Sequence, residues 1–174
     1  MKITFWTDGS SRGNPGKGGW GVFIEMENNK GEKKEFSLSG GKLSTTNNRM
    51  ELTAAIQALR FLDSVFLNKY FIDQKEIKKD LLIIIKTDSK YVKTGIEEWI
   101  INWEKNNWKN ANKKPVLNKD LWQELLSLKN SINDRLIKDN ISEIKWEYVK
   151  GHFGIKGNEI ADKFSTEAAD NILE

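Results

Sequence analysis

A short apolar run that ends in polar residues, Leu81 to Ser89 (LLIIIKTDS), places the strongest constraint on how this chain can fold. Its length, its isoleucines and its abrupt end predict a β-strand that is buried on both faces. The front of the chain repeats the pattern, because Met1 to Ser10 (MKITFWTDGS) also runs from a strand pattern into Thr-Asp. In open α/β sheets the chemistry lies outside the carboxyl ends of parallel strands. If the two strands are parallel neighbours, Asp8 and Asp88 meet at that edge, and a divalent metal ion would relieve their repulsion.

The composition is typical of a globular protein. The chain has 174 residues, of which 38% are hydrophobic and 30% charged, and we expect one domain over residues 1–174. The absence of cysteine excludes disulfides, thiolate catalysis and Cys-based zinc sites. No apolar run is long enough to span a bilayer and no signal peptide precedes the first strand, so we expect a cytoplasmic protein. A net charge of +3 is too small to indicate nucleic-acid binding by itself.

The rest of the pattern predicts a sheet with flanking helices. Residues 8–19 (DGSSRGNPGKGG) are rich in Gly, Asn and Pro and are predicted to form an irregular turn. Hairpin residues at 28–31 separate two strand patterns, so the first three strands should form an antiparallel meander that ends at Gly40-Gly41. Thr45-Thr46-Asn47-Asn48 supplies capping residues for a helix that has Glu51 in about its first turn and runs to about Leu62. The further predicted elements are a partly helical connection over 66–80, short helices after Asp88, an amphipathic helix over 121–128, an unpatterned polar stretch over 130–140, a fifth strand over 144–149 and a closing helix over 158–169.

Two further carboxylates stand out beside the strand-end aspartates. Glu51 falls in the middle of the apolar face of its predicted helix, where an unpartnered charge is very costly. Asp162 lies off the buried stripe of the closing helix, so a cleft-facing and a solvated carboxylate fit its pattern equally. Asp8 and Asp88 also fit a simpler interpretation as turn or capping residues. If all four converge, they suit Mg²⁺, which prefers oxygen ligands, and two ions about 3.5–4 Å apart can promote phosphoryl displacement.

Four motifs in sequence order give these residues a common context. They are Thr7-Asp8-Gly9-Ser10 with Gly13-Asn14-Pro15-Gly16, Thr45 to Leu52 (TTNNRMEL), Thr87 to Val92 (TDSKYV), and Val149-Lys150-Gly151-His152 followed by Gly157-Asn158-Glu159 and Asp162. Together they resemble type 1 ribonuclease H of the bacterial form over nearly the whole chain. The resemblance implies a five-stranded mixed sheet of order 3-2-1-4-5, with strands 1–3 antiparallel, strands 4 and 5 parallel to strand 1, and helices on both faces.

The resemblance also implies an activity and its active-site residues. The expected reaction is endonucleolytic cleavage of the RNA strand of an RNA–DNA hybrid, giving 5′-phosphate and 3′-hydroxyl products. Two Mg²⁺ ions, for which Mn²⁺ can substitute, would be held by Asp8, Glu51, Asp88 and Asp162, with Asp8 bridging both. His152, the only histidine, would assist proton transfer and product departure, although a lone loop histidine is more often surface decoration. We expect a monomer.

Substrate contacts are implied at two places. By resemblance, Asn14 and Asn48 would reach the minor groove of the hybrid, and Thr46 with Asn47 would contact a phosphate of the DNA strand. Helix capping by Thr46 or Asn47 is a simpler role, and both roles can hold at once. The second place resembles the basic protrusion of the bacterial enzymes and carries Lys105, Trp108, Lys109, Lys113 and Lys114, although solvated lysines and a packing tryptophan would give the same pattern.

The sequence departs from the family in a few places. Lys90 stands where many relatives carry Gln, so one expected RNA contact is not carried over, and segments 66–80 and 130–140 look longer than in compact bacterial enzymes. Two other functions fit the same fold: a nuclease or strand-transferase with a different substrate, and a non-catalytic hybrid-binding protein. The substrate-contacting residues argue against the first. The four intact carboxylates argue against the second.

Overall fold

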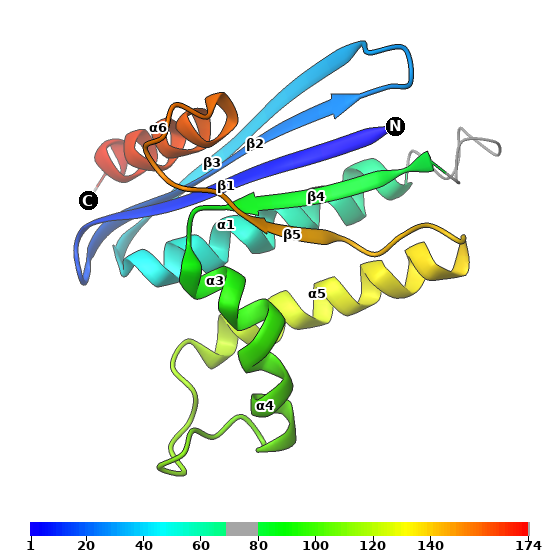
Figure 1. Cartoon of the computed structure of the whole chain (residues 1–174). Helices are drawn as coiled ribbons and strands as arrows, with labels where there is room; N and C mark the ends of the chain where they lie inside the picture. Colours follow the sequence, from blue (N-terminus) through cyan, green and yellow to red (C-terminus); the bar gives the residue numbers. More distant parts are fainter. Residues whose placement is uncertain (69–79, 174) are drawn as a thin grey trace.

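Five strands form one mixed sheet of order β3-β2-β1-β4-β5 in the computed structural model, which describes residues 1–68 and 80–173 (Figure 1). The strands are β1 (Lys2–Gly13), β2 (Gly16–Glu27), β3 (Lys33–Thr45), β4 (Leu82–Thr87) and β5 (Lys145–Tyr148). Strands β1, β2 and β3 pair antiparallel, whereas β4 runs parallel to β1 and β5 runs parallel to β4. The predicted strand order and directions are therefore confirmed.

Helices cover both faces of this sheet. They are α1 (Asn47–Phe61) with the π-helical turn η1 (Leu62–Leu67), α3 (Lys90–Thr94), the π-helical turn η3 (Gly95–Trp99), α4 (Ile100–Lys105), α5 (Lys119–Lys138) and α6 (Lys156–Asn171). Helix α1 packs on β1 from one side and is backed by α5, whereas α6 crosses β1, β2 and β3 on the opposite side (Figure 1). Among the described residues, no helix has the length and apolar character that crossing a bilayer requires.

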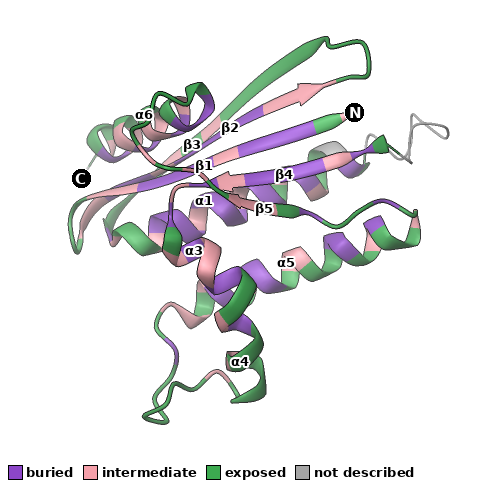
Figure 2. Ribbon diagram, in the orientation of Figure 1, coloured by how far each residue is buried: buried purple, intermediate pink, exposed green. Residues whose placement is uncertain are grey.

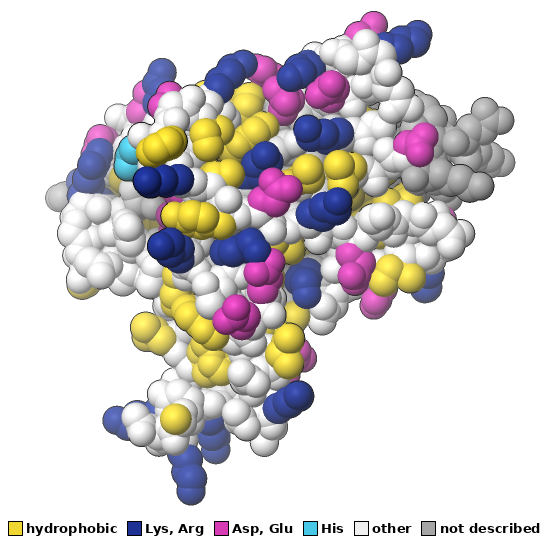
Figure 3. All heavy atoms as spheres, in the orientation of Figure 1, with side chains coloured by type: hydrophobic (Ala, Val, Ile, Leu, Met, Phe, Trp, Pro, Cys, Tyr) yellow, Lys and Arg dark blue, Asp and Glu magenta, His cyan; other side chains and the backbone are white. Residues whose placement is uncertain are grey.

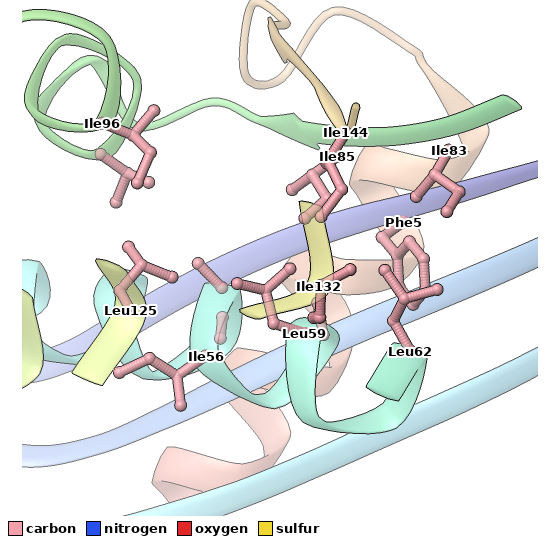
Figure 4. Packing of buried hydrophobic residues seen from close by; sticks show 14 of the residues in the cluster. Phe5, Ile56, Leu59, Leu62, Ile83, Ile85, Ile96, Leu125, Ile132 and Ile144 are labelled. Atoms are coloured by element: carbon pink, nitrogen blue, oxygen red, sulfur yellow. The ribbon is translucent and has the colours of Figure 1, made fainter. Parts of the chain in front are cut away.

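The main core lies between the sheet and helix α1 (Figure 2). Phe5 of β1 and Ile85 of β4 are neighbours in the parallel register, and both are fully buried. Their side chains face Leu59 and Leu62 at the end of the α1 region, as Figure 4 shows. Strand β4, next to the central strand β1, buries three consecutive isoleucines, so side chains on both of its faces are buried. The prediction from the Leu81–Ser89 run is confirmed.

The prediction of an irregular turn over residues 8–19 is wrong. Strand β1 continues to Gly13 and β2 begins at Gly16, so only Asn14 and Pro15, joined by a cis peptide bond, lie outside the strands. Gly9 and Gly19 of this stretch lie where helices α1 and α6 approach the sheet closely, whereas Gly13 and Gly16 form the tight turn itself. A Cβ atom on Gly21 would lie 2.3 Å from the backbone oxygen of Ala161 in α6. Glycine therefore allows helix and strand to touch.

Two further boundaries differ from the sequence prediction. Strand β3 does not end at Gly40-Gly41 but continues to Thr45, because Gly40 pairs with Trp20 and leaves space for the indole ring, 2.7 Å from where a Cβ would stand. Helix α5 extends through most of the stretch 130–140 that was predicted to be unpatterned, because Ile132 and Leu136 are fully buried. Of the predicted connection over 66–80, residues 69–79 lie outside the described residues.

Aromatic side chains anchor the segment between α3 and α5. Trp99 and Trp122 pack with Tyr91, whose hydroxyl group accepts a hydrogen bond of 3.0 Å from the Trp122 indole nitrogen, and Trp103 packs on both tryptophans. The ring of Trp108 lies 6.0 Å from that of Trp103, which extends the cluster outward. These rings pack the short helices against the core. Beyond them the chain forms an exposed loop.

Candidate active site

The carboxyl ends of β1 and β4 bring two aspartates together. The strands pair in parallel as far as Thr7 and Thr87, so Asp8 and Asp88 are the next residues on each. Glu51 completes the group: one carboxylate oxygen from each of the three residues lies within 4.8 Å of the others. Residues far apart in the sequence thus form one acidic cluster among the described residues, as the repeated Thr-Asp pattern predicts.

Glu51 reaches this end of the sheet because helix α1 packs directly against strand β1. The helix begins after Thr46, whose hydroxyl group accepts a hydrogen bond of 3.3 Å from the backbone nitrogen of Arg49. A Cβ atom on Gly9 would lie 2.2 Å from the backbone nitrogen of Glu51, so only glycine permits this approach. Glu51 is consequently only 7% exposed, as its position on the apolar face of the helix predicts.

Burial and mutual repulsion disfavour ionisation of all three carboxylates. Burial, followed by the charges of Asp88 and Asp162, raises the pKa of Asp8 to about 7, against a lowering effect of its hydrogen bond from Ser165. Burial is also the first cause that raises the pKa of Glu51, with the charge of Asp8 second. The pKa of Asp88 is raised by burial, although a hydrogen bond from Asn158 opposes this. The folded chain therefore favours the protonated form of these groups, and a positive charge nearby would be needed to hold all three ionised.

The cluster has the chemistry of a site for hard divalent cations. The Oε2 atom of Glu51 is buried and has no hydrogen-bond partner in the part of the chain that the structure describes. A buried carboxylate oxygen without a donor is costly, and a cation at the cluster would satisfy it. Oxygen donors alone, without nitrogen or sulfur, favour Mg²⁺ or Mn²⁺ over softer metals.

Asp162 lies beside the cluster but outside the group defined by the 4.8 Å distance. It is partly exposed on α6, and its charge contributes to the raised pKa of Asp8, Glu51 and Asp88. The structure therefore brings three of the four predicted carboxylates into mutual contact range. The fourth acts on them electrostatically from the neighbouring helix.

Two residues hold the aspartates in place and were not singled out by sequence reasoning. Ser165, fully buried on α6, donates a hydrogen bond to the Oδ2 atom of Asp8. Asn158 at the start of the same helix donates a hydrogen bond of 3.4 Å to the Oδ2 atom of Asp88. The available signals were weak: Asn158 stands within the last motif, and Ser165 lies one helical turn after Ala161 on the buried stripe of the helix.

His152 lies on the exposed loop that follows β5, near Asp88. Its backbone has a φ of 57°, in the left-handed region. The charge of His152 acts to lower the pKa of Asp88, which places the imidazole close enough to affect that carboxylate. The preceding residue, Gly151, lies directly against Asp88, since a Cβ there would stand 2.8 Å from the Oδ2 atom. The loop therefore packs closely against the acidic cluster at Gly151.

The predicted substrate-contacting amides form a small network between the β1–β2 turn and the start of α1. The side-chain oxygen of Asn47 accepts a hydrogen bond of 2.8 Å from the backbone nitrogen of Ser11, and the side-chain oxygen of Asn14 accepts one of 3.4 Å from the backbone nitrogen of Asn47. Because these oxygens are used within the protein, the amide NH₂ groups remain as donors. Asn48 is exposed beside them.

The predicted basic segment lies away from the carboxylates. Lys109, Lys113 and Lys114 are exposed on the loop between α4 and α5, and Figure 3 shows basic side chains gathered at the tip of this extension. Trp108 is half-buried against Trp103 at its base. Its packing agrees with a structural role.

Comparisons with known proteins agree on one family. The family model described as RNase H matches residues 1–170. The chain is 43% identical over 172 residues to a ribonuclease H of Hydrogenovibrio crunogenus, covering 99% of this chain and 98% of that protein. It is 46% identical over 171 residues to a ribonuclease H of Ruthia magnifica, covering 98% and 97%.

Solved structures share the fold. A structure of LC9-RNase H1, described as a type 1 RNase H with the type 2 active-site motif, matches with a TM-score of 0.77 and 26% identity, covering 99% of this chain and 74% of that one. A foamy viral protease-reverse transcriptase in complex with an RNA/DNA hybrid matches with a TM-score of 0.68 and 21% identity. The chain covers 20% of that larger protein, and this likeness concerns the fold alone.

Proposed function

The chain belongs to the ribonuclease H family, and we propose that it cleaves the RNA strand of RNA–DNA hybrids by a two-metal-ion mechanism. The observation that carries the proposal is the convergence of Asp8, Glu51 and Asp88 at one sheet edge. An acidic cluster of this kind indicates metal-dependent hydrolysis, in contrast to ribonucleases whose catalysis relies on a pair of histidines. The close relatives named ribonuclease H, matched over nearly their whole length, support the reaction class.

Asp8, Glu51, Asp88 and Asp162 would hold two Mg²⁺ ions, for which Mn²⁺ could substitute. When bound, the two ions supply positive charge at the attacking water and at the leaving oxygen of the phosphodiester. Asp8, whose ligand oxygen lies within 4.8 Å of those of both Glu51 and Asp88, would serve both ions. Asp162, on α6, would join from the exposed side, where its charge already reaches the other three.

The reaction requires one water molecule and one proton transfer. The oxygen of the water bonds to phosphorus and the bond from phosphorus to the 3′ oxygen breaks, so the products carry a 5′-phosphate and a 3′-hydroxyl group. The departing 3′ oxygen takes up a proton. His152, beside Asp88 on the loop after β5, is placed to move a proton at this edge and to assist product departure.

The amide network would recognise the hybrid. The free amide groups of Asn14 and Asn47, fixed by their bonded oxygens, are donors suited to a 2′-hydroxyl or phosphate oxygen. Asn48 would act in the minor groove beside them, and Thr46 would contact a phosphate of the DNA strand while also capping α1. These contacts would select the RNA strand for cleavage.

Farther along the duplex, Lys109, Lys113 and Lys114 would bind backbone phosphates, with Trp108 supporting the loop from its packed position. Such contacts are independent of sequence and weaken as salt concentration rises. They would add affinity without selecting which strand is cut. The duplex would therefore extend from the acidic cluster towards this loop.

The test is an end-labelled RNA–DNA hybrid incubated with Mg²⁺, alongside all-DNA and all-RNA duplexes of the same sequence. We expect wild-type protein to cut only the RNA strand of the hybrid, leaving 5′-phosphate ends, and Asp8→Asn to cut none. Equal cutting of the DNA duplex would instead indicate another nuclease on this fold. Tight binding without cutting would indicate a non-catalytic hybrid-binding protein.

A further inference from the structure

Two exposed aromatic rings, each with a lysine over it, lie beside the acidic cluster. The Nζ atom of Lys90 on α3 lies 5.8 Å from the ring centre of Tyr148, at the end of β5. The Nζ atom of Lys150 lies 4.5 Å from the ring centre of Phe153, in the loop that follows. Tyr148 is 41% exposed and Phe153 is 68% exposed. We call these four residues the aromatic–lysine column.

The column is connected to the cluster through the end of the sheet. Tyr148 is the register partner of Thr87, which directly precedes Asp88, and the backbone nitrogen of Val149 donates a hydrogen bond of 2.9 Å to the carbonyl oxygen of Thr87. This bond holds the chain just after β5 against the end of β4, next to Asp88. Figure 3 shows lysines and apolar side chains alternating on this face close to the single histidine.

The charge of the column is unbalanced, unlike that of the surface around it. Nearby, Lys86 pairs with Glu147 at 3.3 Å and Lys156 pairs with Glu35 at 3.0 Å. Lys90 and Lys150 form no ion pair with any carboxylate in residues 1–68 and 80–173. Two ammonium groups without carboxylate partners, held over exposed rings, favour a ligand that carries both negative charge and flat apolar faces.

Single-stranded nucleic acid has this combination, since each nucleotide offers a phosphate and a base that stacks on an aromatic ring. A paired duplex does not, because its base faces are already stacked within the helix. We propose that the aromatic–lysine column binds an unpaired extension of the RNA strand where that strand leaves the hybrid. The RNA strand is the favoured occupant because the column adjoins Asp88 and His152, where the proposed function places the strand being cut.

This inference rests on the proposed function for the identity of the strand, but its test does not require cleavage. Fluorescence anisotropy in EDTA would measure the affinity of the protein for a blunt hybrid and for the same hybrid with an unpaired oligoadenylate tail on the RNA strand, at either end in turn. We expect the tail at one end to raise affinity by about tenfold. A DNA-strand tail and an abasic RNA tail should give at most a small gain.

Variants of the aromatic–lysine column test whether it is the site that binds the tail. Phe153→Ala should abolish most of the gain given by the tail, and Phe153→Trp should retain it, which separates stacking from loop folding. The double variant Lys90→Ala/Lys150→Ala should reduce the gain and its salt dependence. Phe36→Ala and Lys34→Ala, which truncate exposed side chains on β3 across the sheet, are matched controls and should keep the full gain.

Equal affinity of the wild-type protein for blunt and tailed hybrids would overturn the proposal, as would an unchanged gain in Phe153→Ala or an equal gain from the abasic tail. A larger gain from the DNA-strand tail would overturn the assignment to the RNA strand. Cleavage of the blunt hybrid with Mg²⁺, measured in parallel, reports the proposed function separately. If the column does not bind the tail, cleavage of the blunt hybrid can still be measured, and if cleavage fails, binding of the tail can still be measured.

Discussion

The hydroxyl group of Ser165 donates a hydrogen bond to the carboxylate of Asp8, across 157 positions of the sequence. The same hydroxyl oxygen lies 2.9 Å from the backbone oxygen of Asp162, one turn earlier on α6. The contact therefore fixes helix α6, and with it Asp162, against the central strand that carries Asp8. It also stabilises the ionised form of a carboxylate whose burial favours the neutral form.

Removing this hydroxyl group should weaken metal binding. In Ser165→Ala, Asp8 loses a donor to its charged form and α6 loses a tie to β1. A hydrogen bond to a charged group contributes about 1.5–3 kcal/mol, so we expect the Mn²⁺ affinity measured by calorimetry to fall by about tenfold or more. Thr166→Ala is the matched control, because the Thr166 hydroxyl group bonds only carbonyl oxygens of its own helix. Equal affinities of the two variants would contradict the role of Ser165.

The raised pKa values predict how the metal-free protein responds to pH. Asp8 has a pKa of about 7 in the folded chain, well above the unfolded value of about 4, so the folded state binds more protons between these limits. The cluster therefore lowers stability progressively as pH rises from about 4 to 7. Below that range Asp8 is neutral in both states and contributes no such loss.

Comparison with Asp8→Asn isolates this effect, because the amide cannot ionise. In EDTA, we expect the two melting temperatures to be similar near pH 4. The variant should become the more stable protein towards pH 8, by roughly 2 kcal/mol or more. Saturating Mg²⁺ should reduce the difference, since it neutralises the charge. A constant difference at all pH values would show that repulsion at the cluster is not its cause.

His152 is expected to affect turnover more than binding. Asparagine tolerates the left-handed backbone of this position, so His152→Asn removes the imidazole without straining the loop. We expect kcat to fall by about tenfold to a hundredfold, with hybrid affinity in EDTA nearly unchanged. Wild-type turnover in the variant would exclude a proton-transfer role.

The exposed lysines of the α4–α5 loop should set the salt dependence of hybrid binding. The triple variant Lys109→Ala/Lys113→Ala/Lys114→Ala should bind all duplexes more weakly. The slope of log affinity against log salt concentration should become shallower by about 2 to 3, close to one for each phosphate that a lysine no longer neutralises. A triple variant of exposed lysines elsewhere, Lys30, Lys34 and Lys138, controls for net charge. Equal slopes in the two triple variants would show that the loop binds no phosphates.

Part of the site follows from the sequence by simple physical rules. The repeated Thr-Asp at the ends of two strand patterns predicts that Asp8 and Asp88 meet, because parallel neighbours end at the same edge. Glu51 is predictable because a charge on an apolar helix face needs a partner. In these cases a local pattern determines the position in space.

Other features depend on packing that no local pattern records. The glycines around the first turn read as breakers, although Gly9 and Gly21 are in strands so that α1 and α6 can touch the sheet. Ser165 reads as a small residue of a buried stripe, and only the seating of α6 on β1 shows its bond to Asp8. Similarly, Ile132 and Leu136 have partners only once α5 lies along α1.

The most direct test of two-metal binding at the acidic cluster is the position of Mn²⁺ in crystals of Asp8→Asn and wild-type protein, each bound to a hybrid that cannot be cleaved, located by anomalous scattering. In the wild type we expect two peaks about 3.5–4 Å apart, both within ligand distance of Asp8, with Glu51, Asp88 and Asp162 completing the coordination. The variant should lose at least one peak. Wild-type crystals with no peak near Glu51 and Asp88, or with metal held only elsewhere on the surface, would contradict the two-metal site.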